Sequence, residues 1–207
     1  MGHIFTPPLN RLAEFCARDL GIEMFVETGT FRGESAAWAA ERFREVVTIE
    51  RKPELYSQAR ESTVHSNIVF HCGHSPDILP GIAILPNPKL YWLDAHWCGL
   101  HGDAAGVDDQ CPIGDELAAL RGGSENDVIM IDDFHMFAVP PPAPFVAKHW
   151  PALDELFSMT RELPQRRIFV LGNAVILAGG RMIEPLTEFL RTQPPAASGN
   201  GKSEAAG

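Results

Sequence analysis

The chain lacks several features that would place it in common protein classes. Its four cysteines include no C-x-x-C pair, so neither a zinc ribbon nor a disulfide framework is expected, and the thiols are expected to be reduced. No apolar run approaches the roughly 18 residues that cross a membrane. Basic residues number 17 against 27 acidic ones, and the net charge of −10 argues against binding to nucleic-acid phosphates.

The amino-terminal residues also lack a signal-peptide pattern, because no charged segment precedes an apolar one. We therefore expect a cytoplasmic protein with neither a membrane nor a nucleic acid as partner. A length of 207 residues and a hydrophobic content of 45% suit one globular domain. We expect this domain to cover residues 1–192, with an amphipathic helix at 9–20 and a disordered tail at 193–207.

Beyond the first helix, apolar runs of strand length alternate with helical patterns. This alternation predicts βαβ units, and therefore an α/β fold with a mostly parallel sheet and helices on both faces. Near the end of the chain two apolar runs are joined by Gly172-Asn173, a hairpin signal that makes the last strand antiparallel. The expected strands are residues 23–29, 45–50, 67–73, 90–96, 128–134, 167–173 and 174–180.

The sharpest local signal is VETGTFRGES, residues 26–35, where the first strand becomes a helix. Gly29 permits a tight turn, and Gly33 lets the helix pack close to the strand. The dinucleotide fingerprint G-x-G-x-x-G is not met, because position 31 is Phe and two glycines remain. Glu27 at the strand end is a poor neighbour for pyrophosphate, but it suits the cationic amino group of S-adenosylmethionine (SAM), directly or through water.

Glu50 ends the second strand about 20 residues after Gly29, the offset of an acid that grips a ribose diol. These acids predict a nucleoside ligand without phosphates, although a tight turn beside two solvated glutamates is the structural alternative. The predicted cofactor-binding residues of the first two strands are Glu27, Thr28, Gly29, Thr30, Gly33, Ser35, Glu50 and Arg51.

These segments resemble motif I and the second-strand acid of class I SAM-dependent methyltransferases, a similarity that covers most of residues 22–180. The resemblance implies a Rossmann-like, doubly wound sheet of seven strands with the last one antiparallel. It also implies that residues after the third strand pack on the adenine of the cofactor. By position these are Cys72, Gly73, His74 and Ser75, and Ser75 is also a candidate cap for the next helix.

Two acidic clusters follow the fourth and fifth strands, at the edge where open α/β sheets bind ligands. Asp94 and His96 belong to WLDAHW, and Asp132 and Asp133 belong to MIDDFH. Carboxylates delivered by neighbouring strand ends repel each other unless they are solvated, protonated or bridged by a cation. A hard divalent ion, above all Mg²⁺, is therefore expected.

This arrangement resembles the metal-dependent O-methyltransferases of the macrocin and novobiocin type, which act on antibiotic sugars. Their fourth strand ends in L-D-A-D and their fifth in D-D, and residues 73–80, GHSPDILP, are similar to their G-x-x-x-D-x-L-P stretch. The resemblance implies that Asp94, Asp132 and Asp133 bind the metal. It also places Asp94 at both the cofactor and the catalytic centre.

His96 occupies the position of the second Asp in L-D-A-D, which is that family's proposed general base. A histidine can serve as a base near neutral pH. It can equally be a metal ligand, which favours zinc or another transition metal over magnesium, or it can be structural. The sequence leaves these three roles open.

The expected activity is metal-assisted O-methylation of a small-molecule hydroxyl, on a sugar or a secondary metabolite, with SAM as cofactor. An amine acceptor stays open, and so does a homo-oligomer. The alternatives on the same fold are an NAD-dependent oxidoreductase and a non-catalytic nucleoside-binding module. The polar stretch 98–114 is expected to be a lid or an acceptor-recognition loop.

Overall fold

The apolar runs expected to form strands all do so. A computed structural model describes residues 3–99, 106–163 and 166–193, so most of the expected tail and part of the expected lid lie outside the described residues. Strand ends differ from expectation by at most three residues, most of all where acidic residues leave the sheet. The strands are β1 (Met24–Thr28), β2 (Glu45–Glu50), β3 (Ile68–Cys72), β4 (Lys89–Leu93), β5 (Val128–Ile131), β6 (Arg167–Leu171) and β7 (Ala174–Ala178).

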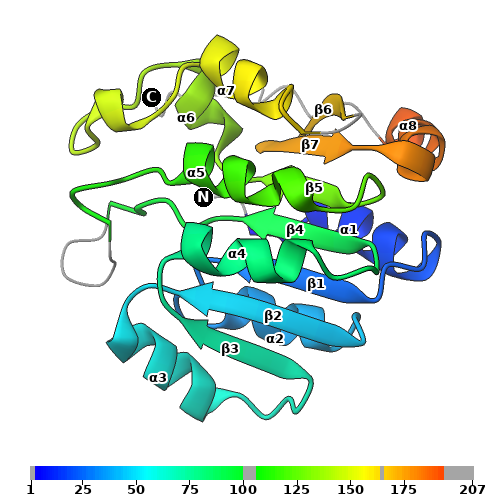
Figure 1. The fold of residues 1–207 in the computed structure, drawn as a ribbon, viewed down its shortest axis with the longest axis horizontal. Coiled ribbons are helices and arrows are strands. Elements are labelled where there is room, and N and C mark those ends of the chain that lie inside the picture. Colours follow the sequence, from blue (N-terminus) through cyan, green and yellow to red (C-terminus); the bar gives the residue numbers. More distant parts are fainter. Residues whose placement is uncertain (1–2, 100–105, 164–165, 194–207) are drawn as a thin grey trace, which may run out of the picture.

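All seven strands join one sheet, in the order β3-β2-β1-β4-β5-β7-β6 (Figure 1). Neighbouring strands from β3 to β5 pair in parallel, whereas β7 runs antiparallel to both β5 and β6. The expected mostly parallel sheet with its last strand antiparallel is therefore confirmed. Because β1 and β4 lie side by side, the strand order reverses between them, which is the position where open α/β sheets bind ligands.

Helices connect the strands, and the first of them ends two residues before its expected boundary. The helix expected at 9–20 ends at Arg18, because the amide of Ile22 bonds back to the Cys16 carbonyl through a left-handed turn at Gly21. The sequence patterns did not predict α6 or α8. The α-helices are α1 (Leu9–Arg18), α2 (Glu34–Ala40), α3 (Pro53–Ser62), α4 (Ser75–Ala83), α5 (Ile113–Ala119), α6 (Phe134–Ala138), α7 (Leu153–Thr160) and α8 (Ile183–Thr192).

Alternate residues of the central strands point to opposite faces and build two cores. Val26 and Tyr91 face the core shared with α4, α5 and α7, whereas Phe25 and Trp92 face the core shared with α1, α2 and α8. Figure 1 shows α4 and α5 in front of the sheet and α1 and α2 behind it. Because helices cover both faces, the carboxyl ends of the strands form the accessible edge that carries polar residues.

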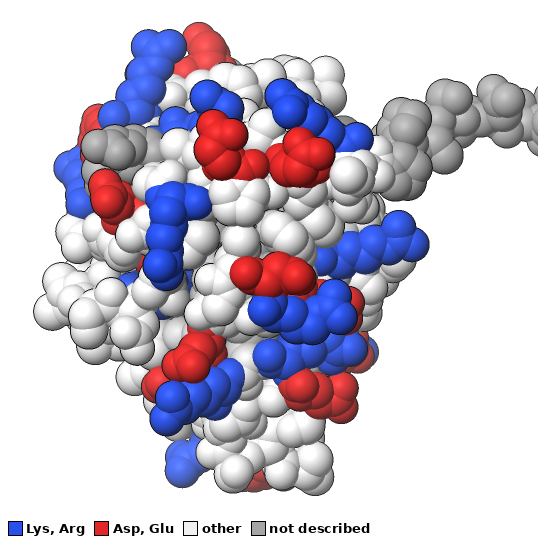
Figure 2. Space-filling model, turned by 90° about the vertical axis from the view of Figure 1, so that its right-hand side faces the viewer, with Lys and Arg blue, Asp and Glu red and all other residues white. Residues whose placement is uncertain are grey.

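The opposite side of the molecule, beyond the amino ends of the parallel strands, carries mixed charge. Figure 2 shows Lys and Arg side chains interspersed with Asp and Glu over this face. Arg44, for example, pairs with Glu23 at 3.3 Å, and both side chains are exposed, so the pair adds little stability. Within the described ranges, no helix combines the length and the apolar character that crossing a bilayer demands.

Candidate functional site

Four backbone hydrogen bonds extend the sheet just past the ends of its parallel strands. In each, an amide that follows one strand bonds to a carbonyl at or near the end of the neighbouring strand. These bonds hold the residues of the predicted site side by side at one edge. The donors are Gly29, Gly73, Asp94 and Asp132, and their acceptors are Ile49, Glu50, Thr28 and Leu93, at 2.9, 2.8, 3.2 and 3.2 Å.

The turn after β1 requires its glycines. Gly29 has a φ of +82° and Gly33 a φ of +79°, in the left-handed region that glycine adopts without strain. A Cβ atom on Gly29 would lie 2.3 Å from the carbonyl oxygen of Asp94. The turn therefore brings the first predicted loop into direct backbone contact with the residue that begins the acidic cluster.

Glu50 is held with its carboxylate at the pocket. The amides of Phe31 and Lys52 donate to its two oxygens at 2.8 and 2.9 Å, and 5% of the residue is exposed. Burial raises the pKa of Glu50 above its ordinary value, although these amide bonds oppose the shift. The carboxylate is thus oriented before any ligand arrives, as a ribose-binding acid needs to be.

Glu27 lies in the interior of the sheet. It is 1% exposed, and its carboxylate accepts a hydrogen bond from the Thr48 hydroxyl at 2.7 Å. Burial raises the pKa of Glu27 to about 8. Among the described residues Glu27 does not belong to the pocket wall. Its predicted contact with a cofactor stays a prediction.

A pocket opens at the carboxyl edge of the sheet between these loops. Thr28 and Gly33 lie outside its lining, and Thr28 is fully buried. Most other predicted cofactor residues line the pocket, namely Gly29, Thr30, Ser35, Glu50, Arg51, Gly73, His74, Ser75 and Asp94.

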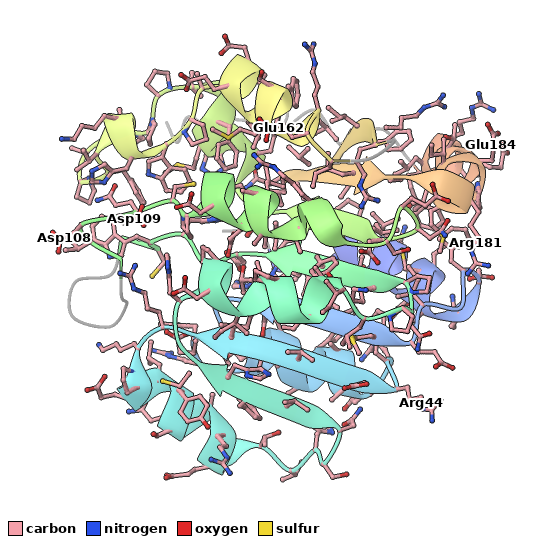
Figure 3. The ribbon with its side chains drawn as sticks, viewed as in Figure 1. Arg44, Asp108, Asp109, Glu162, Arg181 and Glu184 are labelled. Carbon is pink, nitrogen blue, oxygen red and sulfur yellow. The ribbon has the colours of Figure 1, made fainter. Side chains whose placement is uncertain are left out.

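Several pocket residues were not predicted. His3 and Phe5 stack with ring centroids 4.8 Å apart and line the pocket from the amino-terminal segment, and Asp109 lines it from the loop before α5. Figure 3 shows Asp108 and Asp109 on the side toward which the parallel strands point. The amino-terminal contact has no local sequence signal, whereas Asp109 belongs to the stretch 98–114 that is expected to be a lid or an acceptor-recognition loop.

A buried acid on α5 was also missed. Glu116 is 1% exposed, and it accepts a hydrogen bond from the Ser75 hydroxyl at 2.6 Å. Burial raises the pKa of Glu116. The expectation that Ser75 caps α4 is wrong, because Ser75 is the first residue of the helix, His74 precedes it as N-cap, and the Ser75 hydroxyl is bonded to Glu116.

The predicted acidic cluster comes together after β4 and β5. One ligand atom each from Asp94, His96 and Asp132 lie within 4.8 Å of one another. Nε2 of His96 is 3.4 Å from Oδ1 of Asp94 and 3.2 Å from Oδ2 of Asp133. All four residues singled out for catalysis or metal binding thus lie in one cluster, and Asp94, His96 and Asp133 also line the pocket.

The charges in this cluster perturb each other. Burial, followed by repulsion from Asp133, raises the pKa of Asp132 to about 7, and burial raises that of Asp94. Burial would lower the pKa of His96, but Asp133 and Asp94 outweigh it and raise the value to about 9. Contact with His96 in turn lowers the pKa of Asp133 despite its burial. An excess of buried negative charge is what a cation relieves.

The Asp132 carboxylate fits such a cation. Both of its oxygens are buried, and within the described part of the chain neither has a hydrogen-bond partner. Unpaired buried carboxylate oxygens are costly, and oxygen is the preferred donor for hard divalent ions. The two oxygens of Asp132, together with the neighbouring Asp94 and Asp133 carboxylates, therefore fit a divalent cation as oxygen ligands.

The β6–β7 hairpin supports this cluster. The sequence did not predict this contact. Asp133 has a φ of +54°, and the side-chain amide of Asn173 donates to its Oδ1 at 3.1 Å. The Asn173 carbonyl accepts from the Phe134 amide at 2.8 Å, and its Oδ1 accepts from the His135 amide at 3.0 Å. A turn distant in sequence thus fixes the loop after β5.

The strand order, the antiparallel β7 and the pocket at the strand reversal define a class I methyltransferase fold. No family model and no curated protein sequence matches the chain. An O-methyltransferase from Bacillus cereus, in complex with S-adenosylhomocysteine (SAH), matches with a TM-score of 0.59 and 14% identity, over 86% of this chain and 82% of its own. The SAM-bound O-methyltransferase TomG from Streptomyces achromogenes matches with 0.58 and 18%, over 84% and 81%.

Substituting Gly29 by alanine tests the close approach of the two loops. A left-handed φ costs an alanine roughly 1–2 kcal/mol, and at this position the Cβ also clashes with the Asp94 backbone. Gly21→Ala is the matched control, because Gly21 has a φ of +66° but no atom within 4 Å of an added Cβ. In urea unfolding, Gly29→Ala should lose clearly more free energy of unfolding than Gly21→Ala. Equal losses would contradict the close approach of Gly29 to the Asp94 backbone.

Glu27→Gln tests the buried carboxyl group. The folded pKa of Glu27, about 8, exceeds its ordinary value of 4.5, so between these values the unfolded chain releases a proton that the folded chain keeps. Wild-type stability therefore falls with rising pH across this window, by at most about 1.4 kcal/mol per pH unit from this group. Measured by urea unfolding, the free energy of unfolding of Glu27→Gln should rise relative to that of wild type between pH 5 and 8. If the two free energies change in parallel with pH, the assignment of a buried, protonated Glu27 is refuted.

Proposed function

We propose that the chain is a SAM-dependent methyltransferase that transfers a methyl group to a hydroxyl oxygen of a small molecule, a sugar or a secondary metabolite, with the help of a divalent cation. The observation that carries this proposal is the position of Asp94. It lines the pocket beside the glycine loop, and its carboxylate also belongs to the acidic cluster. A cofactor and an acceptor would therefore meet at this residue.

The cofactor end of the pocket suits a nucleoside with a cationic group. Glu50 presents a carboxylate that two amides hold in place, and it would accept hydrogen bonds from both ribose hydroxyls. The glycine turn leaves no side chain between the ligand and the backbone. Two solved structures of the same fold, named above, contain SAM or SAH, which supports the same cofactor here.

The acceptor end suits an oxygen nucleophile. When bound, SAM supplies a methyl group on a sulfonium, so the protein mainly aligns the reactants and activates the nucleophile. A divalent cation held by Asp94, Asp132 and Asp133 would supply Lewis acidity that lowers the pKa of an acceptor hydroxyl. Transfer of the methyl group to an acceptor oxygen would convert SAM to SAH, and the proton of the acceptor hydroxyl would pass to solvent.

Glu50→Gln tests the cofactor site. The amide replaces one acceptor oxygen by a donor that faces a backbone amide, so calorimetry should show SAH binding about 10- to 100-fold more weakly. Glu54→Gln changes an exposed acid on the adjacent α3, and should leave the affinity unchanged. A thermal shift with NAD⁺ and none with SAH would favour an oxidoreductase and contradict the proposal.

Asp132→Asn tests the cation-assisted step. Removing this charge should lower methyl transfer to sugar or phenolic hydroxyls by roughly 100-fold or more, followed as SAH and methylated product by mass spectrometry. Asp154→Asn alters an exposed acid on α7, outside the pocket lining, and should keep full turnover. Undiminished, chelator-resistant turnover in Asp132→Asn would remove the cation from the proposal and leave the cofactor site intact.

A further inference from the structure

The imidazole of His96 points into the acidic cluster. Its Nε2 lies between Oδ1 of Asp94 and Oδ2 of Asp133, at 3.4 and 3.2 Å. Ligand atoms about 2.1 Å from a shared ion lie about 3 Å apart when adjacent and about 4.2 Å apart when opposite. One ligand atom each from Asp94, His96 and Asp132 lie within 4.8 Å of one another. A small inward shift of these side chains would therefore place the three atoms around one ion.

Aromatic side chains pack against the His96 imidazole and hold it in the acidic cluster. The rings of His96 and Trp150 meet edge to face, with centroids 5.2 Å apart. Trp150 in turn packs against Phe137 and Phe145, at 5.7 and 5.8 Å. The His96 side chain is 4% exposed. Packing on this side prevents the ring from swinging toward solvent, so its position is set by the fold.

The buried Nε2 atom has two carboxylate neighbours but no hydrogen bond of good geometry. Within the described part of the chain this geometry is also missing for both oxygens of Asp132, although Nε2 lies within ion-pair distance of Asp94 and Asp133. Buried polar atoms without partners are rare because they lose their hydration without compensation. One nitrogen and two oxygens, all buried and without a well-formed hydrogen bond in the described ranges, belong to one cluster that a coordinated cation would satisfy.

We propose that Nε2 of His96 is a ligand to the cation, and that this donor set selects a first-row transition ion such as Co²⁺, Fe²⁺ or Zn²⁺ over Mg²⁺. Magnesium binds oxygen ligands almost exclusively, whereas imidazole nitrogen suits the later divalent ions. The inference deepens the cation site of the proposed function and rests on it. A coordinated Nε2 cannot accept a proton, so His96 serves here as a ligand and not as the base.

Metal binding without SAM or acceptor tests this assignment. The chelator-treated protein is titrated calorimetrically with Co²⁺ and with Mg²⁺, and we expect Co²⁺ to bind about 100-fold more tightly. His96→Asp supplies the acid that the L-D-A-D pattern has at this position. It should retain a Mg²⁺ site and reduce the ratio of the two affinities about tenfold or more. An unchanged ratio would overturn the proposal.

Proton NMR of the Co²⁺-loaded wild-type protein detects a histidine ligand directly, and two variants assign it. A coordinated imidazole keeps a proton on Nδ1, so wild type should show a strongly shifted, solvent-exchangeable resonance that His96→Asp lacks. His135→Ala is the matched control, because His135 is exposed and bonded to Asn173, and it should keep the resonance.

The two proposals fail in different ways. The absence of the shifted resonance from Co²⁺-loaded wild type overturns the ligand assignment, and so does its loss in His135→Ala alone. Binding of SAH without binding of either ion overturns the cation site and leaves the cofactor proposal standing. Binding of both ions without SAH would contradict the proposed methyltransferase and uphold the metal site.

Discussion

Hydrogen bonds between an amide just past one strand and a carbonyl at the end of its neighbour hold the carboxyl edge of this sheet in register. They place the glycine turn, the segment after β3 and both acidic loops at one level. Gly29 lies so close to the Asp94 carbonyl that no side chain fits between them. The separation between the glycine turn and the acidic cluster is therefore set by backbone geometry, and the side chains add chemistry to positions already fixed.

The buried acids around this edge differ in how their charge is compensated. Glu50 has two backbone amides, Glu27 has a threonine hydroxyl and Glu116 has a serine hydroxyl. Asp132 has no hydrogen-bond partner within the described ranges. The other three acids have hydrogen-bond donors, so Asp132 is the one among these four whose buried charge is left without a donor in the described part of the chain, and this exception supports the proposed cation site.

Much of the fold could be predicted because its signals are local. Each strand is an apolar run bounded by glycine or charge, and the βαβ rules then bring the ends of β4 and β5 together, which is why Asp94 and Asp132 could be paired from sequence. The burial of Glu27, the Ser75–Glu116 bond and the packing of Trp150 on His96 could not be anticipated. Each depends on contacts between distant segments, and no residue pattern encodes such contacts locally.

The antiparallel hairpin has a consequence for the order of assembly. Because β7 runs against its neighbours, its first residue lies at the carboxyl edge, and Asn173 just before it secures the unusual backbone of Asp133. The residues that carry the acidic cluster are all synthesised by position 133, yet their geometry is completed when the chain has reached position 173. The geometry of the acidic cluster therefore depends on a hairpin that follows Asp133 by 40 residues in the chain.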